Sequence, residues 1–297
     1  MADEITPAPS ASRSRMKQLI WPDPLVVPPS NQHTHSIILL HGRGSNAARF
    51  GPELLGAPTA ALGVPLGAHF PGVKFIFPTA KKRRAVAFNR TPINQWFDVY
   101  ALTEPTVRGD LPYDGLRETS AFVHGLIAAE AQLVGVDHVV IGGLSQGCAA
   151  ALHVLLNFHG PSPLLGLIGM SGWLPFAEIL RDETEGEDVF DAEDPQTNAQ
   201  LNAANTARDI ASLPPLALPK DQVPCFVHTP IFLGHGVYDQ KVPMRLGAQA
   251  HDVMRALGCD VEWREYNEGH WYKVPDEIDD LVVWLKKRIN PQITSLD

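Results

Sequence analysis

Short apolar runs alternate with longer segments of mixed polarity along most of the chain. Most of these runs are continuously apolar, which is typical of strands in a parallel sheet that is covered on both faces. We therefore predict strands at SIILL (36–40), VKFIF (73–77), HVVIGG (138–143), LLGLIGM (164–170), TPIFLG (229–234) and VEWREY (261–266).

Several of the intervening segments carry apolar residues at helical spacing. Residues 115–134, 245–257 and 276–289 each place such residues largely on one face, as Ile278 and Leu281 illustrate in the last segment. Strands that alternate with helices predict an α/β fold, with a mainly parallel central sheet and helices on both of its faces.

Two segments break this alternation. Residues 1–30 are rich in Pro, Ser and Ala, and we predict a flexible N-terminal tail there, followed by a single domain over residues 31–291. Residues 178–228 are acidic and then rich in proline, without a strand pattern. An insertion of this kind is either a solvated surface excursion or a lid or binding element.

The strongest local motif is a G-x-S-x-G, Gly143-Leu144-Ser145-Gln146-Gly147. An apolar run precedes it and the helix-forming QGCAAALHVLL follows, which is the strand–turn–helix context of a nucleophile elbow. Glycine suits the flanking positions because so sharp a turn strains the backbone and packs closely against its neighbours. The motif predicts that Ser145 is a catalytic nucleophile, and the alternative is a tight turn with an incidental serine.

A serine nucleophile needs a histidine to accept its proton and a carboxylate to hold that histidine. In α/β-hydrolases the acid follows the serine along the chain, and we expect it on a loop after a later strand. Asp239 lies in such a place, in HGVYDQKVP after the apolar run 229–234. Asp252 and Asp260 lie in or just after a predicted helix, so we predict Asp239 as the acid.

The histidine comes last in this order, which leaves His251 and His270 as candidates. His251 falls inside the predicted helix 245–257, where a histidine is more often an exposed or hydrogen-bonded helix residue than a catalytic base. His270 lies in the loop NEGHWY after the last predicted strand, and Gly269 gives the chain freedom to aim the ring. We predict His270 as the general base.

Two main-chain amides are candidates for an oxyanion hole. One is the N–H that follows the nucleophile, which belongs to Gln146, and the other comes from a glycine-containing loop after an early strand. The run 36–40 ends in His41-Gly42-Arg43-Gly44, so we predict the amide of Arg43 as the second donor. The alternative for this loop is a plain glycine turn.

Composition narrows the partners and the compartment. A net charge of −9 argues against nucleic acid as the main partner, because phosphate binding needs a basic face. The three cysteines, Cys148, Cys225 and Cys259, include no CxxC pair, so neither a disulfide framework nor a zinc site is indicated. The N-terminus lacks the apolar core of a secretory signal, and no run approaches the roughly 18 apolar residues of a transmembrane segment. We expect a cytoplasmic protein.

Six segments in this order resemble the acyl-protein thioesterase and phospholipase/carboxylesterase family of α/β-hydrolases, from about residue 36 to residue 288. They are LLHGRGSN, QWFDVY (95–100), GGLSQGCAA, SGWLP (171–175), HGVYDQKVP and the final GH. The resemblance implies the α/β-hydrolase fold, an enzyme without cofactor, and the same triad and oxyanion residues. It also implies that Trp96 and Trp173 lie near an acyl pocket, although large aromatic residues are as often simply core.

Three features depart from the family pattern. Arg43 stands where better-known members carry an apolar residue, which makes the pocket entrance charged. The segment 178–228 is longer than the usual connection and starts beside SGWLP, so it could cover the site with residues such as Val189, Phe190, Leu213, Leu216 and Leu218. The basic loop 81–84 is additional, and it either meets anionic lipid or an acidic substrate or is a solvated face.

Three functions compete at this point. The first is hydrolysis of an acylated protein or a lipid ester through an acyl-enzyme on Ser145. The second keeps the same triad for a specialised small ester or lactone. The third is a non-catalytic binding module, since a fold does not imply a function. The intact set of Ser145, Asp239 and His270 argues against the third.

Overall fold

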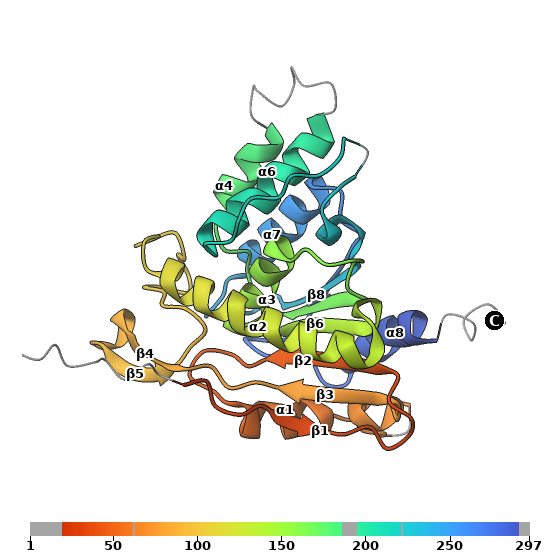
Figure 1. Cartoon of the computed structure of the whole chain (residues 1–297). Coiled ribbons are helices and arrows are strands. Elements are labelled where there is room, and N and C mark those ends of the chain that lie inside the picture. Colours follow the sequence, from red (N-terminus) through yellow and green to blue (C-terminus); the bar gives the residue numbers. More distant parts are fainter. Residues whose placement is uncertain (1–19, 62, 186–194, 221, 291–297) are drawn as a thin grey trace, which may run out of the picture.

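Seven strands form one central sheet in the computed structural model, which describes residues 20–61, 63–185, 195–220 and 222–290 (Figure 1). The strand order is β1-β3-β2-β6-β7-β8-β9, and every neighbouring pair is parallel except β1 with β3. All six predicted strands are confirmed. Their bounds are β2 His35–Leu40, β3 Val73–Phe77, β6 Val139–Leu144, β7 Gly166–Met170, β8 Ile231–Gly236 and β9 Val261–Tyr266.

Helices cover both faces of the sheet, as the alternation of elements predicted. Successive side chains of β2 point to opposite faces, so Ile38 and Leu40 join one apolar core while Ile37 and Leu39 join the other. The first core is completed by α2 (Pro112–Val134), α3 (Gln146–Asn157) and α7 (Met244–Ala256). The second is completed by α1 (Ala47–Leu55) and α8 (Asp276–Ile289).

The prediction of a flexible tail over residues 1–30 is wrong for residues 20–30, and residues 1–19 lie outside the described residues. Strand β1 (Leu25–Val27) pairs with β3 at the edge of the sheet. The indole of Trp21 stacks on Phe122 of α2, with ring centroids 4.1 Å apart, and the ammonium of Lys81 lies 4.9 Å from the indole centroid. The prolines around this segment obscured the strand pattern in the sequence. The segment with Trp21 and β1 is stabilised by residues far along the chain, in β3 and α2.

The described residues of the insertion 178–228 are in large part helical and packed on the main body, and not only a solvated loop. The insertion contains most of α4 (Ala177–Glu185) and all of α6 (Pro195–Ile210), and α6 packs against both α3 and α4 (Figure 1). The buried face of α6 is built mainly from alanines, Ala199, Ala203, Ala204 and Ala207. Small side chains let the helix approach α3 closely, and because alanine is weakly apolar the sequence showed no clear core pattern here.

The basic loop 81–84 forms one arm of a hairpin, in which β4 (Lys82–Ala85) pairs with β5 (Thr91–Asn94) beside the main body (Figure 1). Lys81 and Arg83 turn inward and pair with the carboxylate of Glu118 at 3.2 and 2.8 Å. Lys82 and Arg84 are exposed. The loop is therefore part structural and part solvated, and a contact with lipid or an acidic substrate stays a prediction.

Replacing Trp21 should lower the stability of the whole domain and not only that of the N-terminal segment. We expect Trp21→Ala to lower the free energy of unfolding by about 2 kcal/mol, because the stack on Phe122 and the cation contacts are lost. Ile20→Ala is the matched control, since Ile20 is 89% exposed and should change stability by less than about 0.5 kcal/mol. Urea unfolding measures both, and equal midpoints for the two variants would contradict the packing of this segment.

Candidate active site

Ser145 stands on a strained turn between β6 and α3. Its φ of 57° and ψ of −121° are unusual for a residue with a side chain, and strain of this kind gathers at functional sites. A side-chain carbon at Gly143 or at Gly147 would collide with the carbonyl oxygen of Leu40, so both positions require glycine. The main-chain N–H of Ser145 donates to the carbonyl of Met170 at 2.8 Å. The turn is thereby fixed between β2 and β7, with Ser145 at the N-terminus of α3.

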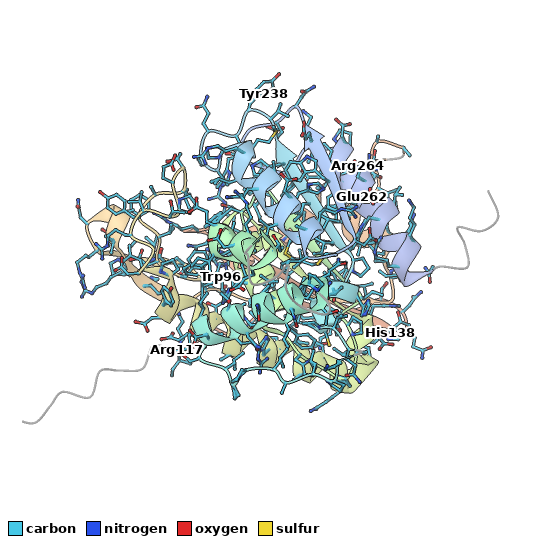
Figure 2. The ribbon with its side chains drawn as sticks, turned by 90° about the horizontal axis from the view of Figure 1, so that it is seen from above. Trp96, Arg117, His138, Tyr238, Glu262 and Arg264 are labelled. Atoms are coloured by element: carbon cyan, nitrogen blue, oxygen red, sulfur yellow. The ribbon has the colours of Figure 1, made fainter. Side chains whose placement is uncertain are left out.

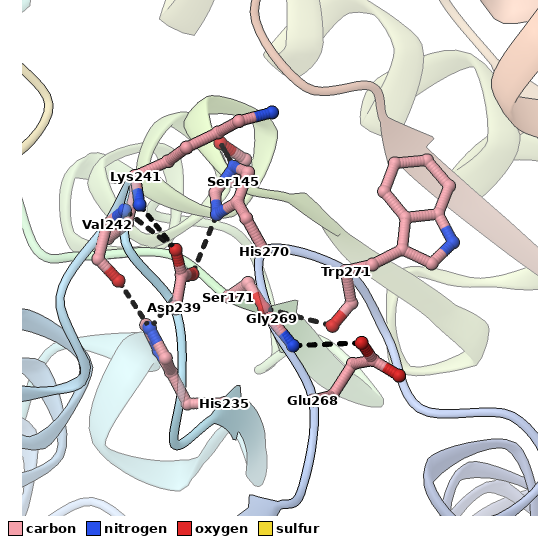
Figure 3. Close-up of polar contacts among 10 residues, drawn as sticks. All are labelled: Ser145, Ser171, His235, Asp239, Lys241, Val242, Glu268, Gly269, His270 and Trp271. Carbon is pink, nitrogen blue, oxygen red and sulfur yellow. Dashed lines mark hydrogen bonds and ion pairs between the residues drawn. The ribbon is translucent and has the colours of Figure 1, made fainter.

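The structure brings together Ser145, His270 and Asp239, the three predicted triad residues (Figure 3). The Oγ atom of Ser145 lies 2.8 Å from Nε2 of His270, to which its hydroxyl donates. The Nδ1 atom of the same ring lies 2.7 Å from a carboxylate oxygen of Asp239, to which its N–H donates. Asp239 follows β8 and His270 follows β9, so adjacent parallel strands deliver both residues to one edge of the sheet. This geometry permits proton transfer from the serine to the imidazole.

The Asp239 carboxylate has partners on both oxygens. The amides of Lys241 and Val242 donate to one oxygen at 2.8 and 2.9 Å, and the other oxygen faces His270 and, at 3.4 Å, Nε2 of His235. Burial by itself would raise the pKa of Asp239, but the hydrogen bonds from His235, His270 and the Val242 amide outweigh it and hold the pKa below its ordinary value. The carboxylate therefore stays ionised at neutral pH.

His235 is a site residue that the sequence reasoning missed. It is buried at the end of β8, where Nε2 lies 2.9 Å from the carbonyl of Val242 as well as close to Asp239. Its place in HGVYD, four residues before the acid and at the end of a strand, was the available signal.

Gln146 and Arg43, the predicted oxyanion residues, both lie at the catalytic edge. Gln146 is the first residue of α3, and its side chain ties the turn to another loop, since Oε1 accepts from the amide of Trp96 at 3.1 Å and Nε2 donates to the carbonyl of Phe97 at 2.7 Å. The Arg43 guanidinium lies 4.5 Å from the ring centroid of Phe88 and donates to the carbonyl of Val99 at 3.3 Å.

The ring of His41 fixes the peptide unit that carries the Arg43 amide. The N–H of Ala80 donates to Nε2 at 3.0 Å, so the ring proton must be on Nδ1, which donates to the carbonyl of Gly42 at 2.7 Å. That carbonyl and the N–H of Arg43 are two ends of one planar peptide. Burial lowers the pKa of His41 to about 4, which keeps the ring in this neutral tautomer at neutral pH.

Trp96 does not lie where the resemblance implied. Its side chain is fully buried in the interior (Figure 2), it lines neither hollow described below, and its indole N–H donates to the carbonyl of His41 at 2.7 Å. With its ring buried and its N–H bonded, Trp96 supports the loop after β2. The next residue, Phe97, reaches the surface of a hollow instead.

Two hollows lie at this edge of the sheet. The catalytic hollow, of about 280 Å³, is lined by Ser145 and His270 together with Leu102, Lys241 and other residues. The apolar hollow, of about 330 Å³, is lined in part by Phe97, Trp173, Phe176, Ile179 and Leu246. The segments 99–106 and 241–246 contribute residues to both hollows, but no single residue lines both of them.

The start of the insertion forms a wall of the apolar hollow, through Glu178 and Ile179. In the part of the insertion that the structure describes, no residue lines the catalytic hollow, and Leu213, Leu216 and Leu218 line neither hollow. The described residues of the insertion therefore form no wall of the hollow around Ser145. Val189 and Phe190 lie outside the described residues.

Other chemistry is sparse in the described parts of the chain. No group of three or more His, Cys, Asp or Glu residues there is placed to hold a metal ion, and no helix there is long and apolar enough to cross a membrane. The three cysteines are free and buried, and burial raises the pKa of Cys148 and of Cys259 to about 12. These two thiols are therefore protonated at neutral pH.

Comparison with known proteins agrees with the fold and the motifs. The phospholipase/carboxylesterase family profile matches residues 22–189. Acyl-protein thioesterase 1 of Gibberella zeae is 25% identical over 91% of this chain and 97% of its own length, and that of Yarrowia lipolytica is 26% identical over 89% and 96%. The crystal structure of Zea mays acyl-protein thioesterase 2 superposes with a TM-score of 0.62 at 27% identity, covering 90% of this chain and 99% of that one. The chain belongs to the phospholipase/carboxylesterase family of α/β-hydrolases, and it is a serine hydrolase that cleaves carboxylic ester or thioester bonds.

Proposed function

We propose that this enzyme removes acyl groups from thioesters or esters, as an acyl-protein thioesterase does, with Ser145 as nucleophile, His270 as general base and Asp239 as the acid. The observation that carries the proposal is the unbroken hydrogen-bond chain from Ser145 through His270 to Asp239, at 2.8 and 2.7 Å, on a strained elbow. The names of the relatives in Gibberella zeae and Yarrowia lipolytica support the acyl-thioester substrate.

The reaction proceeds in two halves. Ser145 Oγ attacks the acyl carbonyl while its proton moves to Nε2 of His270, and the imidazolium then protonates the departing thiol or alcohol as its bond to the acyl carbon breaks. Water repeats the sequence on the acyl-enzyme and releases the carboxylic acid. Asp239 steadies the imidazolium through Nδ1–H, which its ionised state allows.

The negative oxygen of each tetrahedral intermediate is stabilised by the main-chain amides of Arg43 and Gln146. Three hydrogen bonds support these donors: His41 to the Gly42 carbonyl, and the two that the Gln146 side chain makes to the loop 96–97. A donor on the Gly42 carbonyl polarises the peptide unit and strengthens its other end, the Arg43 N–H. His41 is therefore a positioning residue in the proposed mechanism.

The acyl chain lies in the apolar hollow, against Trp173 and Phe97. These two rings meet edge to face with centroids 5.8 Å apart, and segments 99–106 and 241–246 contribute to the walls of both this hollow and the catalytic one. Its volume of about 330 Å³ falls in the range of small-ligand pockets. The proposed compartment is the cytoplasm, which the three free cysteines support, since oxidising compartments favour disulfides.

Removing the nucleophile separates an enzyme from a binding module. Ser145→Ala should abolish both thioester hydrolysis and covalent labelling by a fluorophosphonate, while thermal unfolding shows an intact fold. Labelling that persisted in this variant would move the nucleophile elsewhere, and an unlabelled, inactive parent protein would support the binding module.

The two candidate histidines give a matched pair. His270→Ala should lower kcat by on the order of 10³ or more, because the general base is lost. His251 lies on α7 with its ring 2.9 Å from Asp252, and His251→Ala should change kcat by less than about twofold. Steady-state kinetics on one acyl thioester compares them, and similar losses in both would refute the assignment of the base.

The neutral state of His41 makes a linkage prediction. Because its pKa falls from 6.5 in the unfolded chain to about 4 in the fold, protonation favours the unfolded state, and stability is lost as pH falls from about 6.5 towards 4. Between pH 7.5 and pH 5 the parent should lose about 2 kcal/mol more than His41→Gln, which lacks the titrating ring. Urea unfolding at the two pH values measures the difference, and equal losses would show that the ring does not titrate in this way.

A further inference from the structure

Three cationic side chains belong to the residues that line the catalytic hollow: Arg43, Arg49 and Lys241. Among the described residues that line this hollow, none is Asp or Glu. This local charge is opposite in sign to that of the whole chain, whose net charge is −9. Acidic residues outnumber basic ones in the whole chain, so a hollow lined by three basic residues and no acidic one is unexpected. Such a local positive potential attracts anionic substrates.

The three cations are not consumed by ion pairs. Within the described residues no carboxylate lies within 4 Å of the charged nitrogens of Arg43, Arg49 or Lys241. Arg49 and Lys241 are exposed, and Arg43 is half-buried against the ring of Phe88, where the charge of Asp98 attracts its guanidinium. Figure 3 shows the Lys241 side chain extending past Ser145 and His270. The charges of Arg49 and Lys241 are therefore free to act on a substrate, whereas the Arg43 guanidinium is already held by Phe88 and the Val99 carbonyl.

The neighbouring hollow differs in character. Besides its aromatic walls, the apolar hollow is lined by two carboxylates, Glu104 and Glu178, and one cation, Arg245. Arg245 pairs with Glu104 at 2.6 Å, which leaves Glu178 as the unpaired charge of this group within the described residues. An anionic group on the acyl chain would be repelled there, so an anion on the substrate fits only the catalytic hollow.

We propose that the catalytic hollow selects substrates whose leaving group carries an anionic oxygen group, a carboxylate or a phosphate, close to the scissile bond. The inference rests on the proposed function, because it assumes that Ser145 attacks an acyl thioester or ester. Water adds an OH to the acyl carbon, the bond from that carbon to the leaving sulfur or oxygen breaks, and a proton completes the departing thiol or alcohol. The anionic group itself is unchanged by the reaction.

The test compares two thioesters that differ in one group. S-octanoyl-N-acetylcysteine carries a carboxylate beside the thiol, and the corresponding cysteine amide is neutral and nearly the same shape. Thiol release is followed with a chromogenic disulfide, and each kcat/KM is divided by the rate of hydroxide-catalysed hydrolysis to remove intrinsic reactivity. We expect the parent enzyme to prefer the anionic member by about tenfold at low salt, and the preference to shrink as salt is added.

Equal values for the two members, or a preference for the neutral one, both in this pair and in the phosphate pair described below, would overturn the proposal and leave the hydrolase function in place. Hydrolysis of neither member, with an intact fold, would instead contradict the proposed function. The two failures are therefore distinguishable in one experiment.

Charge variants locate the effect. Lys241→Gln and Arg49→Gln should each lower the anionic-to-neutral ratio by at least about threefold, and Lys241→Arg should restore most of it. Lys82→Gln is the matched control, since it removes one exposed charge on β4 outside the hollow and should leave the ratio unchanged. An equal fall in the Lys82→Gln variant would mean general charge attraction and would overturn a site in the hollow.

A second pair identifies the anion. 1-Octanoylglycerol 3-phosphate and 1-octanoylglycerol repeat the comparison with a phosphate on an oxygen ester. A larger ratio in this pair assigns the hollow to phosphate, and a larger ratio in the cysteine pair assigns it to carboxylate. A ratio near one in both pairs would refute the proposal.

Discussion

The carbonyl oxygen of Leu40 is the point around which the catalytic edge is arranged. Gly143 and Gly147 both lie so close to it that neither can carry a side chain, so the end of β2 is held directly against the turn after β6. Because the two strands end together, the loop with Arg43 and the elbow with Ser145 leave the sheet from adjacent positions. The positions of the Arg43 loop, of Ser145 and of α3 depend on this close approach.

A buried polar network keeps those loops in place. The side chain of Gln146 is bonded to the backbone of 96–97, the indole of Trp96 to the carbonyl of His41, and the ring of His41 to the backbone on either side. Each of these bonds satisfies a group that would otherwise be costly to bury. The proposed oxyanion donors are therefore oriented before a substrate arrives, which is the condition for electrostatic stabilisation of a transition state.

The sequence allowed good prediction wherever a local pattern carries the information. Continuous apolar runs predicted six strands of the sheet, and chain order with strand ends selected Ser145, Asp239 and His270, which the structure brings within hydrogen-bonding distance. What it did not reveal depends on partners far along the chain. Strand β1 forms because β3 is beside it, and α6 is buried by alanines that carry almost no pattern.

The site residues divide in the same way. Trp96 was expected at a ligand because a motif contained it, but the depth of a tryptophan depends on what surrounds it in three dimensions. His41 and His235 lie inside recognised motifs, but nothing in those motifs marks them as supporting residues. Their partners are the backbone N–H of Ala80 and the backbone carbonyl of Val242, which almost any residue could supply. Side-chain to main-chain bonds of this kind leave little trace in a sequence.

The helix α3 is buried along its whole length, and part of that burial comes from α6 in the insertion. If this insertion lay only on the surface, the protein could lose it and keep its core. Here Ala203, Ala204 and Ala207 belong to the same apolar core as the sheet. A chain without them would expose apolar side chains of α3 to water. The insertion is thus part of the hydrophobic core, and its deletion would require compensating polar substitutions on α3.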